Sequence, residues 1–176
     1  MGRGLFFLSV FFLFCGNCFA QWYENGDNQR EEAKEKCTKK EDGLYYITGE
    51  DNPFSGIIFK KDGKGRLQLK VEILKGKFHG VRREFYTHGH GRGKSESYWK
   101  DGKKNWVSRT WHKNGNLRTE KHWKVGKLHG VSREWHENGK VKNMTFYREG
   151  LRFGPSKSYD EKGELVSAMD TRIGSK

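Results

Sequence analysis

The sequence predicts an all-β fold, a single-layer antiparallel meander of hairpin repeats that forms an open sheet. The first observation is an internal repeat, because Trp106–His129 and Gly130–Phe153 align without a gap. The second is composition: 23 glycines, only 2 prolines and 14% aromatic residues indicate many turns and argue against a disordered chain. The third is the alternation of side chains between the turns, since a period of two identifies strands.

Turn glycines set the period of the repeat. The first glycine of each unit is followed by a second one eleven residues later. The first set is Gly65, Gly91, Gly115, Gly139 and Gly163, and the second is Gly76, Gly102, Gly126, Gly150 and Gly174. A junction glycine opens four units, at Gly56, Gly80, Gly130 and Gly154, and Trp106 takes that place once. The unit of 24 residues, stretched to 26 by His88–Gly91, predicts an array whose units begin near 56, 80, 106, 130 and 154.

Each unit is expected to form two antiparallel strands joined by tight turns. Three residue pairs tolerate positive φ and favour hairpins: Asn114-Gly115, Asn138-Gly139 and Asp101-Gly102. Alternation along the fourth unit places Trp135 and Ser132 on opposite faces of the sheet, and it places Val141 on the face of Asn143.

Two columns of aromatic residues follow from this register. The first is Phe85, Trp111, Trp135 and Tyr159; the second is Trp99, Trp123 and Tyr147, with Ile73 in the first unit. One interpretation is that the rings stack as a ladder, because aromatic cross-strand pairs stabilise sheets. The other is an exposed platform for a ligand or partner, and a single-layer sheet allows both. These seven aromatic residues are the candidate binding face.

Residues 1–20 have the layout of a secretory signal peptide. One positive charge precedes an apolar run from Leu5 to Cys15, and Ala20 closes it. The run is shorter than the roughly 20 apolar residues of a membrane-spanning helix; an uncleaved anchor is the alternative. We therefore expect an exported protein, periplasmic, envelope-associated or secreted. Cleavage after Ala20 leaves Cys37 as the one cysteine, without an internal disulfide.

Residues 21–42 are expected to form a polar segment before the repeat domain, which spans 43–176. The stretch Gln29–Lys40 is rich in Glu and Lys, and either a short helix or a disordered, solvated segment fits it. Gly43–Ile47 is expected to form a strand that covers one end of the array around Tyr45. The stretch after Met169 is expected to cap the other end.

No pattern of catalytic residues stands out, so we expect no enzymatic activity and no cofactor. Paired carboxylates, a nucleophile elbow and a phosphate loop are not found. Equivalent histidines such as His112 and His136 would lie two strands apart, about 9.5 Å. That separation is too long for both to bind one zinc ion, whose bonds to nitrogen are about 2 Å. His88 and His90 lack further ligands, and we predict no metal site.

Charge is the remaining indication of function. The formal net charge is +13 and the isoelectric point is about 9.7. Such a balance favours anionic partners: an acidic protein, an acidic polysaccharide or an anionic lipid. Nucleic acid is a weaker alternative because export is expected. The open sheet has free edges, which also allow edge-to-edge dimers.

The units resemble the MORN-repeat variant. Its pattern of glycine, aromatic residue and Asn/Asp-Gly-Lys occurs here as GVSREWHENGKVK in 130–142 and as YWKDGKK in 98–104. The stretches Gly43–Ile47 and Pro53–Gly56 are similar to the usual entry to such arrays. The resemblance extends over roughly residues 43–174, and bacterial proteins of this kind are often labelled YwqK-like antitoxins.

The resemblance implies an interaction scaffold, which binds partner proteins in some members and anionic membrane surfaces in MORN proteins generally. The expected function is an exported, non-enzymatic repeat scaffold for protein–protein interaction. One alternative is a binder of an anionic membrane or envelope surface. Another is an antitoxin or immunity protein that neutralises a partner toxin.

Overall fold

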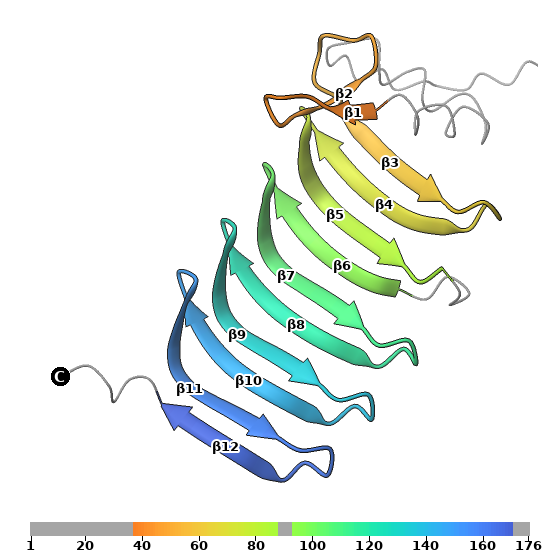
Figure 1. Ribbon diagram of the computed structural model, residues 1–176. Coiled ribbons are helices and arrows are strands. Elements are labelled where there is room, and N and C mark those ends of the chain that lie inside the picture. Colours follow the sequence, from red (N-terminus) through yellow and green to blue (C-terminus); the bar gives the residue numbers. More distant parts are fainter. Residues whose placement is uncertain (1–36, 88–92, 171–176) are drawn as a thin grey trace, which may run out of the picture.

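The computed structural model describes residues 37–87 and 93–170, and every regular element in these ranges is a β-strand. Ten strands form the main sheet: β3 Gly56–Lys61, β4 Leu67–Leu74, β5 Lys77–Phe85, β6 Gly93–Lys100, β7 Lys103–Trp111, β8 Leu117–Lys124, β9 Lys127–Trp135, β10 Val141–Arg148, β11 Leu151–Tyr159 and β12 Leu165–Asp170. Each pairs antiparallel with its neighbours in sequence, and β3 and β12 are the two edges (Figure 1). The predicted all-β open meander is confirmed. The described residues contain no helix that could cross a membrane.

Two kinds of turn alternate along the meander. Two-residue turns have positive φ at both positions, as type I′ turns require: Lys75-Gly76, Asp101-Gly102, Val125-Gly126 and Glu149-Gly150. The other turns are longer. In one of them the Gly115 N–H donates to the carbonyl of His112, whose own N–H donates to the carbonyl of Asn116. Only the glycine of this turn has a positive φ. Asn114 and Asn138 therefore occupy turns as predicted, but without the left-handed conformation that motivated the prediction.

A β-bulge marks the junction residue of each later unit. The four junction residues have φ between 66° and 94°, and the strand register shifts opposite each of them: Gly80, Trp106, Gly130 and Gly154. A bulge bends its strand and increases the local twist. The bowed strands in Figure 1 agree with this.

A second bulge follows the longer turns. In β10, Val141 pairs with Trp135 and Asn143 pairs with Glu134, so that Lys142 is the extra residue. We predicted that Val141 shares the face of Asn143. This is wrong, because the bulge pairs Val141 with Trp135, whose side chain lies on the other face of the sheet from Asn143. The same register shift makes four further residues extra: Gln68 in β4, Lys94 in β6, Arg118 in β8 and Val166 in β12.

A small hydrophobic core lies at the N-terminal end of the array. There a separate two-stranded sheet, β1 Cys37–Lys39 and β2 Tyr45–Ile47, lies beside the β4–β5 turn (Figure 1). Its Tyr45 ring stacks on Phe78 with 5.3 Å between ring centres, and the Tyr45 N–H donates to the Gly76 carbonyl at 3.0 Å. The buried members of this core are Phe54, Val71 and Ile73. The predicted cover at this end of the array is confirmed.

The polar segment before the repeats differs from the prediction in its described part. Cys37–Lys39 is a strand rather than the end of a helix or a disordered stretch. Burial against the core raises the pKa of the Cys37 thiol. The predicted signal peptide, the inserted turn with His88 and His90, and the predicted cap after Met169 fall wholly or mostly in residues 1–36, 88–92 and 171–176, outside the described residues.

Candidate binding groove

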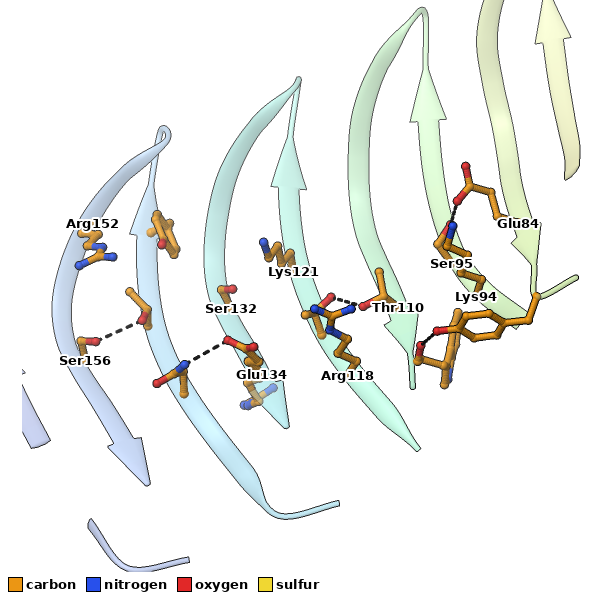
Figure 2. Close-up of a pocket in the computed structure, with 17 residues that line it drawn as sticks. Glu84, Lys94, Ser95, Thr110, Arg118, Lys121, Ser132, Glu134, Arg152 and Ser156 are labelled. Carbon is orange, nitrogen blue, oxygen red and sulfur yellow. Dashed lines mark hydrogen bonds between the residues drawn. The ribbon is translucent and has the colours of Figure 1, made fainter. Parts of the chain in front are cut away.

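One face of the main sheet carries a groove of about 690 Å³. Side chains from seven consecutive strands, β5 to β11, line it, and they point into a common space in Figure 2. We call this the groove face and the other side of the sheet the opposite face. Consecutive residues of a strand alternate between the two faces, so the strand register decides which side chains reach the groove.

Two rows of small polar residues form the floor of the groove. Cross-strand pairing aligns Ser95, Thr110, Thr119, Glu134 and Asn143 in one row, and Ser97, Ser108, Lys121, Ser132, Thr145 and Ser156 in the next. Within the floor, the Thr110 and Thr119 hydroxyls lie 2.7 Å apart, and Asn143 Nδ2 donates to Glu134 at 3.0 Å. Because a hydroxyl rotates and both donates and accepts, this floor can satisfy many arrangements of ligand groups.

The floor is polar only beyond the first unit. In β4 the same two rows hold Leu69 and Val71, which pair with Glu84 and Arg82 of β5. Both apolar residues belong to the core beneath the β1–β2 sheet. The sequence therefore changes from apolar to polar where the covering sheet ends, which is why the groove begins at β5.

Three basic residues from one repeat position lie along one side of the groove face. They are the bulge residues Lys94, Arg118 and Lys142, all exposed to solvent. Lys94 and Arg118 line the groove, and Lys142 Nζ lies 3.8 Å from Glu134 Oε1, which belongs to the floor. A bulge can redirect a side chain in this way, because the extra residue interrupts the regular alternation.

The second aromatic column lies toward the other side of the groove. The indole N–H groups of Trp99 and Trp123 each donate to a serine hydroxyl of the floor at 2.8 Å, and Tyr147 lines the groove. Lys104 lies between the two indoles, with Nζ 5.6 Å from the Trp99 ring centre and 4.8 Å from that of Trp123. Burial, followed by the charge of nearby Lys121, lowers the pKa of Lys104.

The seven predicted aromatic residues do not share one face. Strand alternation places the side chain of Trp135 on the face away from Ser132, which is the opposite face. The other members of its column lie on that face as well: Phe85, Trp111 and Tyr159. Trp111 also reaches the end of the groove, where the Tyr86 hydroxyl donates to its carbonyl at 2.6 Å. Sequence reasoning had placed all seven on one candidate face, because it could not locate the bulges.

The predicted ring ladder is not formed. In the described part of the chain, no ring contact joins two members of either column. Phe78 instead meets Trp99 edge-on at 5.1 Å, and the Lys104 ammonium separates Trp99 from Trp123. Members of one column lie two strands apart, about 9.5 Å, which is beyond ring contact.

The two faces differ in how their charges are balanced. On the opposite face, arginines pair with glutamates: Arg83 with Glu96 at 2.6 Å, and Arg109 with Glu120 at 2.8 Å. In the groove, Arg118, Lys121 and Arg152 have no carboxylate within ion-pair distance among residues 37–87 and 93–170. The groove therefore has positive charge that is left for a ligand.

Sequence reasoning missed the three bulge cations. A signal was present, because the third residue after the first turn glycine is basic in three successive units: Lys94, Arg118 and Lys142. In the two outer units this position holds Gln68 and Val166. The position was hidden because its side chain, by simple alternation, would be assigned to the opposite face.

The groove offers charge and hydrogen bonds. Burial raises the pKa of Glu84, but hydrogen bonds from Arg82 and Ser95 outweigh it, so that the net pKa is below the usual value and the carboxylate stays ionised. Within the described ranges, no three His, Cys, Asp or Glu side chains gather as metal ligands would. The arrangement suits recognition of an anionic ligand.

The fold and the groove define a class of protein, the open single-layer repeat sheet with a groove along one face. Residues 128–149, which cover one unit of the array, match the family described as MORN repeat variant. MORN repeats are commonly protein- or membrane-binding repeats. The match does not extend to the YwqK-like antitoxin family.

Other comparisons add little. No curated protein matches the chain significantly. A solved structure of a mutant S. aureus TarM, in complex with fondaparinux, α-GlcNAc-glycerol and UDP, is similar with 12% identity and a TM-score of 0.34. The similarity covers 76% of this chain and 25% of that chain, so this chain spans about a quarter of its length. A likeness this distant carries no argument about ligands.

Proposed function

We propose that this protein is an exported, non-enzymatic repeat scaffold that holds a protein partner in the groove. One observation carries the proposal: the groove crosses seven strands as a continuous polar floor, and three of its cations, Arg118, Lys121 and Arg152, have no carboxylate within ion-pair distance in the described part of the chain. The match of one unit to the MORN repeat variant supports a binding role. The signal-peptide layout of residues 1–20 supports export.

The shape of the groove favours a protein segment over a membrane surface. The hydroxyl floor is recessed between long side chains, such as Arg118 on one side and Tyr147 on the other. A narrow chain can enter such a groove and use its hydrogen-bonding groups. A flat lipid surface meets only the protruding side chains, and on the opposite face arginines are already paired with glutamates.

Site-specific photocrosslinking in the native host tests this function. A photoreactive phenylalanine analogue is placed at Ser132 in the groove floor, and at exposed Lys157 on the opposite face as the matched control. We expect a discrete protein adduct from position 132 and none from position 157, with mass spectrometry identifying the partner. Fractionation of the same cells checks whether the protein is exported.

Other results would overturn the proposal. Protein adducts of equal yield from both positions, or none from position 132, would exclude the groove as the protein-binding site. An adduct with lipid alone would point to a membrane surface instead.

A further inference from the structure

The groove has a spacing that selects one conformation of a bound chain, and this inference rests on the proposed function. Equivalent positions of successive units lie two strands apart, about 9.5 Å at a strand spacing of about 4.8 Å. The cations Lys94, Arg118 and Lys142 recur at this spacing along one side. The aromatic residues Trp99, Trp123 and Tyr147 recur at the same spacing along the other side.

A polyproline II helix matches this spacing. It has three residues per turn and a rise of about 3.1 Å per residue, so that every third side chain returns to the same face after about 9.3 Å. A β-strand presents one face every two residues, about 6.6 Å. An α-helix returns after about 5.4 Å, or about 10.8 Å for two turns. Over three units the differences between these strand and α-helix repeats and the groove spacing of about 9.5 Å add up, whereas the polyproline II repeat keeps matching the groove positions.

The floor and the aromatic side also fit such a segment. A polyproline II helix makes no internal hydrogen bonds, so its backbone carbonyls need donors from the solvent or the partner. The hydroxyls of Thr119, Ser132 and Thr145 are donors that can rotate toward them. Proline-rich segments of this conformation dock in grooves lined by aromatic side chains. Here Tyr147 lines the groove, and Trp99 and Trp123 lie beside it, bonded to serine hydroxyls of the floor.

The charge of the groove selects acidic side chains on that segment. Five cationic side chains line the groove against two carboxylates, Glu84 and Glu134, and one of the five, Arg133, is paired with Glu120 at 3.5 Å. Both carboxylates already bond to neighbours on the same face, Glu84 to Arg82 and Ser95, and Glu134 to Asn143 and, at 3.8 Å, to Lys142. The positive charge that remains favours an anionic ligand whose charges repeat every 9 to 10 Å, an interval that follows from about two strand spacings.

We propose that the groove binds a polyproline II segment of the partner with an acidic residue at every third position and proline between. The acidic side chains lie against Lys94, Arg118 and Lys142. The proline rings lie toward Trp99, Trp123 and Tyr147, and the segment runs across the strands, along the array.

Binding of synthetic peptides to the full chain tests the proposal. The probe is a fluorescent peptide of repeated Glu-Pro-Pro triplets, and its control has the same composition with all glutamates in one block. We expect the triplet peptide to bind about tenfold more tightly, because only its charges can meet all three cations at once. Equal affinity of the two peptides would overturn the proposal.

Matched variants locate the binding. The groove variant combines Lys94→Gln, Arg118→Gln and Lys142→Gln. The control combines Lys100→Gln, Lys124→Gln and Lys157→Gln, three exposed lysines that strand alternation places on the opposite face. Both lose the same charge, but we expect a dissociation constant about tenfold higher for the groove variant and less than about twofold higher for the control. Equal losses would mean attraction by net charge alone.

Two further measurements keep the result interpretable. Circular dichroism checks the fold of each variant, and the single change Arg118→Gln, at an exposed side chain, replaces the triple variant if that does not fold. Heparin and phosphatidylserine vesicles are compared as competitors. If either competitor displaces the fluorescent triplet peptide more effectively than unlabelled triplet peptide does, the groove prefers an anionic polysaccharide or lipid, and the proposal is overturned. A crosslinked protein at Ser132 without peptide binding would retain the proposed function and reject this inference.

Discussion

Trp106 stands at the position that Gly130 occupies one unit later, and both residues have a positive φ, 66° for Trp106 and 94° for Gly130. Glycine adopts this conformation freely, whereas the left-handed region costs other residues about 1–2 kcal/mol. The Trp106 side chain is 69% exposed, so that burial offsets little of this cost. The third unit is therefore strained at its junction.

Replacing Trp106 by glycine should stabilise the protein. We expect Trp106→Gly to raise the free energy of unfolding by about 1 kcal/mol, since the strain removed exceeds the added flexibility of the unfolded chain. Urea unfolding followed by circular dichroism measures it. The reciprocal change Gly130→Ala should cost about 1 kcal/mol, although its new Cβ meets His122 at an ordinary 3.5 Å. A loss of stability in Trp106→Gly would contradict the strain.

Val125 is a second site of backbone strain. It has φ 48° at the first position of a type I′ turn, where other units carry Lys75, Asp101 and Glu149. A β-branched residue is poorly suited to this region, while Asn-Gly is the preferred pair for such a turn. Because the side chain is 61% exposed, little packing is lost on replacement. We expect Val125→Asn to stabilise by about 1 kcal/mol in thermal unfolding, and Lys75→Val to destabilise by a similar amount. Opposite signs would contradict this.

Asp62 should make stability depend on acid pH. Hydrogen bonds from the Arg66 side chain and backbone, and from Lys64, lower the pKa of its carboxyl to about 2. A folded pKa below the unfolded value of about 3.9 stabilises the fold fully above that unfolded value. The contribution is lost as the pH falls from about 4 through 2. Urea midpoints at pH 4, 3 and 2, near those two pKa values, should therefore fall more steeply for the wild type than for Asp62→Asn. Parallel curves would rule out this contribution.

Asparagine side chains join the longer turns of neighbouring units. Asn138 Oδ1 accepts from the Lys140 N–H within its own turn, and Nδ2 donates to the Glu161 carbonyl of the next unit at 2.8 Å. Asn138→Asp keeps the acceptor and removes the donor, which isolates the contact between units. We expect it to lower the free energy of unfolding by about 0.5–1 kcal/mol. Asn138→Ala, which removes both bonds, should cost more. Equal stability of Asn138→Asp and the wild type would show that the contact between units contributes nothing.

The architecture could be predicted because its signals are local. Glycine at a fixed interval, residue pairs such as Asp101-Gly102, and alternating side chains each depend on neighbours in sequence. The covering strand around Tyr45 was also predicted correctly. The short strand β1, at Cys37–Lys39, was missed because its charged sequence shows no alternation and it depends on pairing with β2.

The candidate site was predicted only in part. Trp99, Trp123 and Tyr147 do lie on the groove face, but Phe85, Trp111, Trp135 and Tyr159 follow the other face. Lys104 could not be foreseen between two indoles, because its position in the repeat holds Phe78 and Leu128 in other units. Only the spatial arrangement shows that the ammonium replaces a ring contact.

Repeat length, strand content and an open meander follow from the amino-acid pattern alone, because turn glycines and alternation act over a few residues. The identity of each face needed the assembled sheet. A bulge shifts the direction of side chains by one residue, and its place depends on pairing with the neighbouring strand. For that reason the bulges that bring Lys94, Arg118 and Lys142 beside the polar floor, and with them the groove itself, were decided by the tertiary structure.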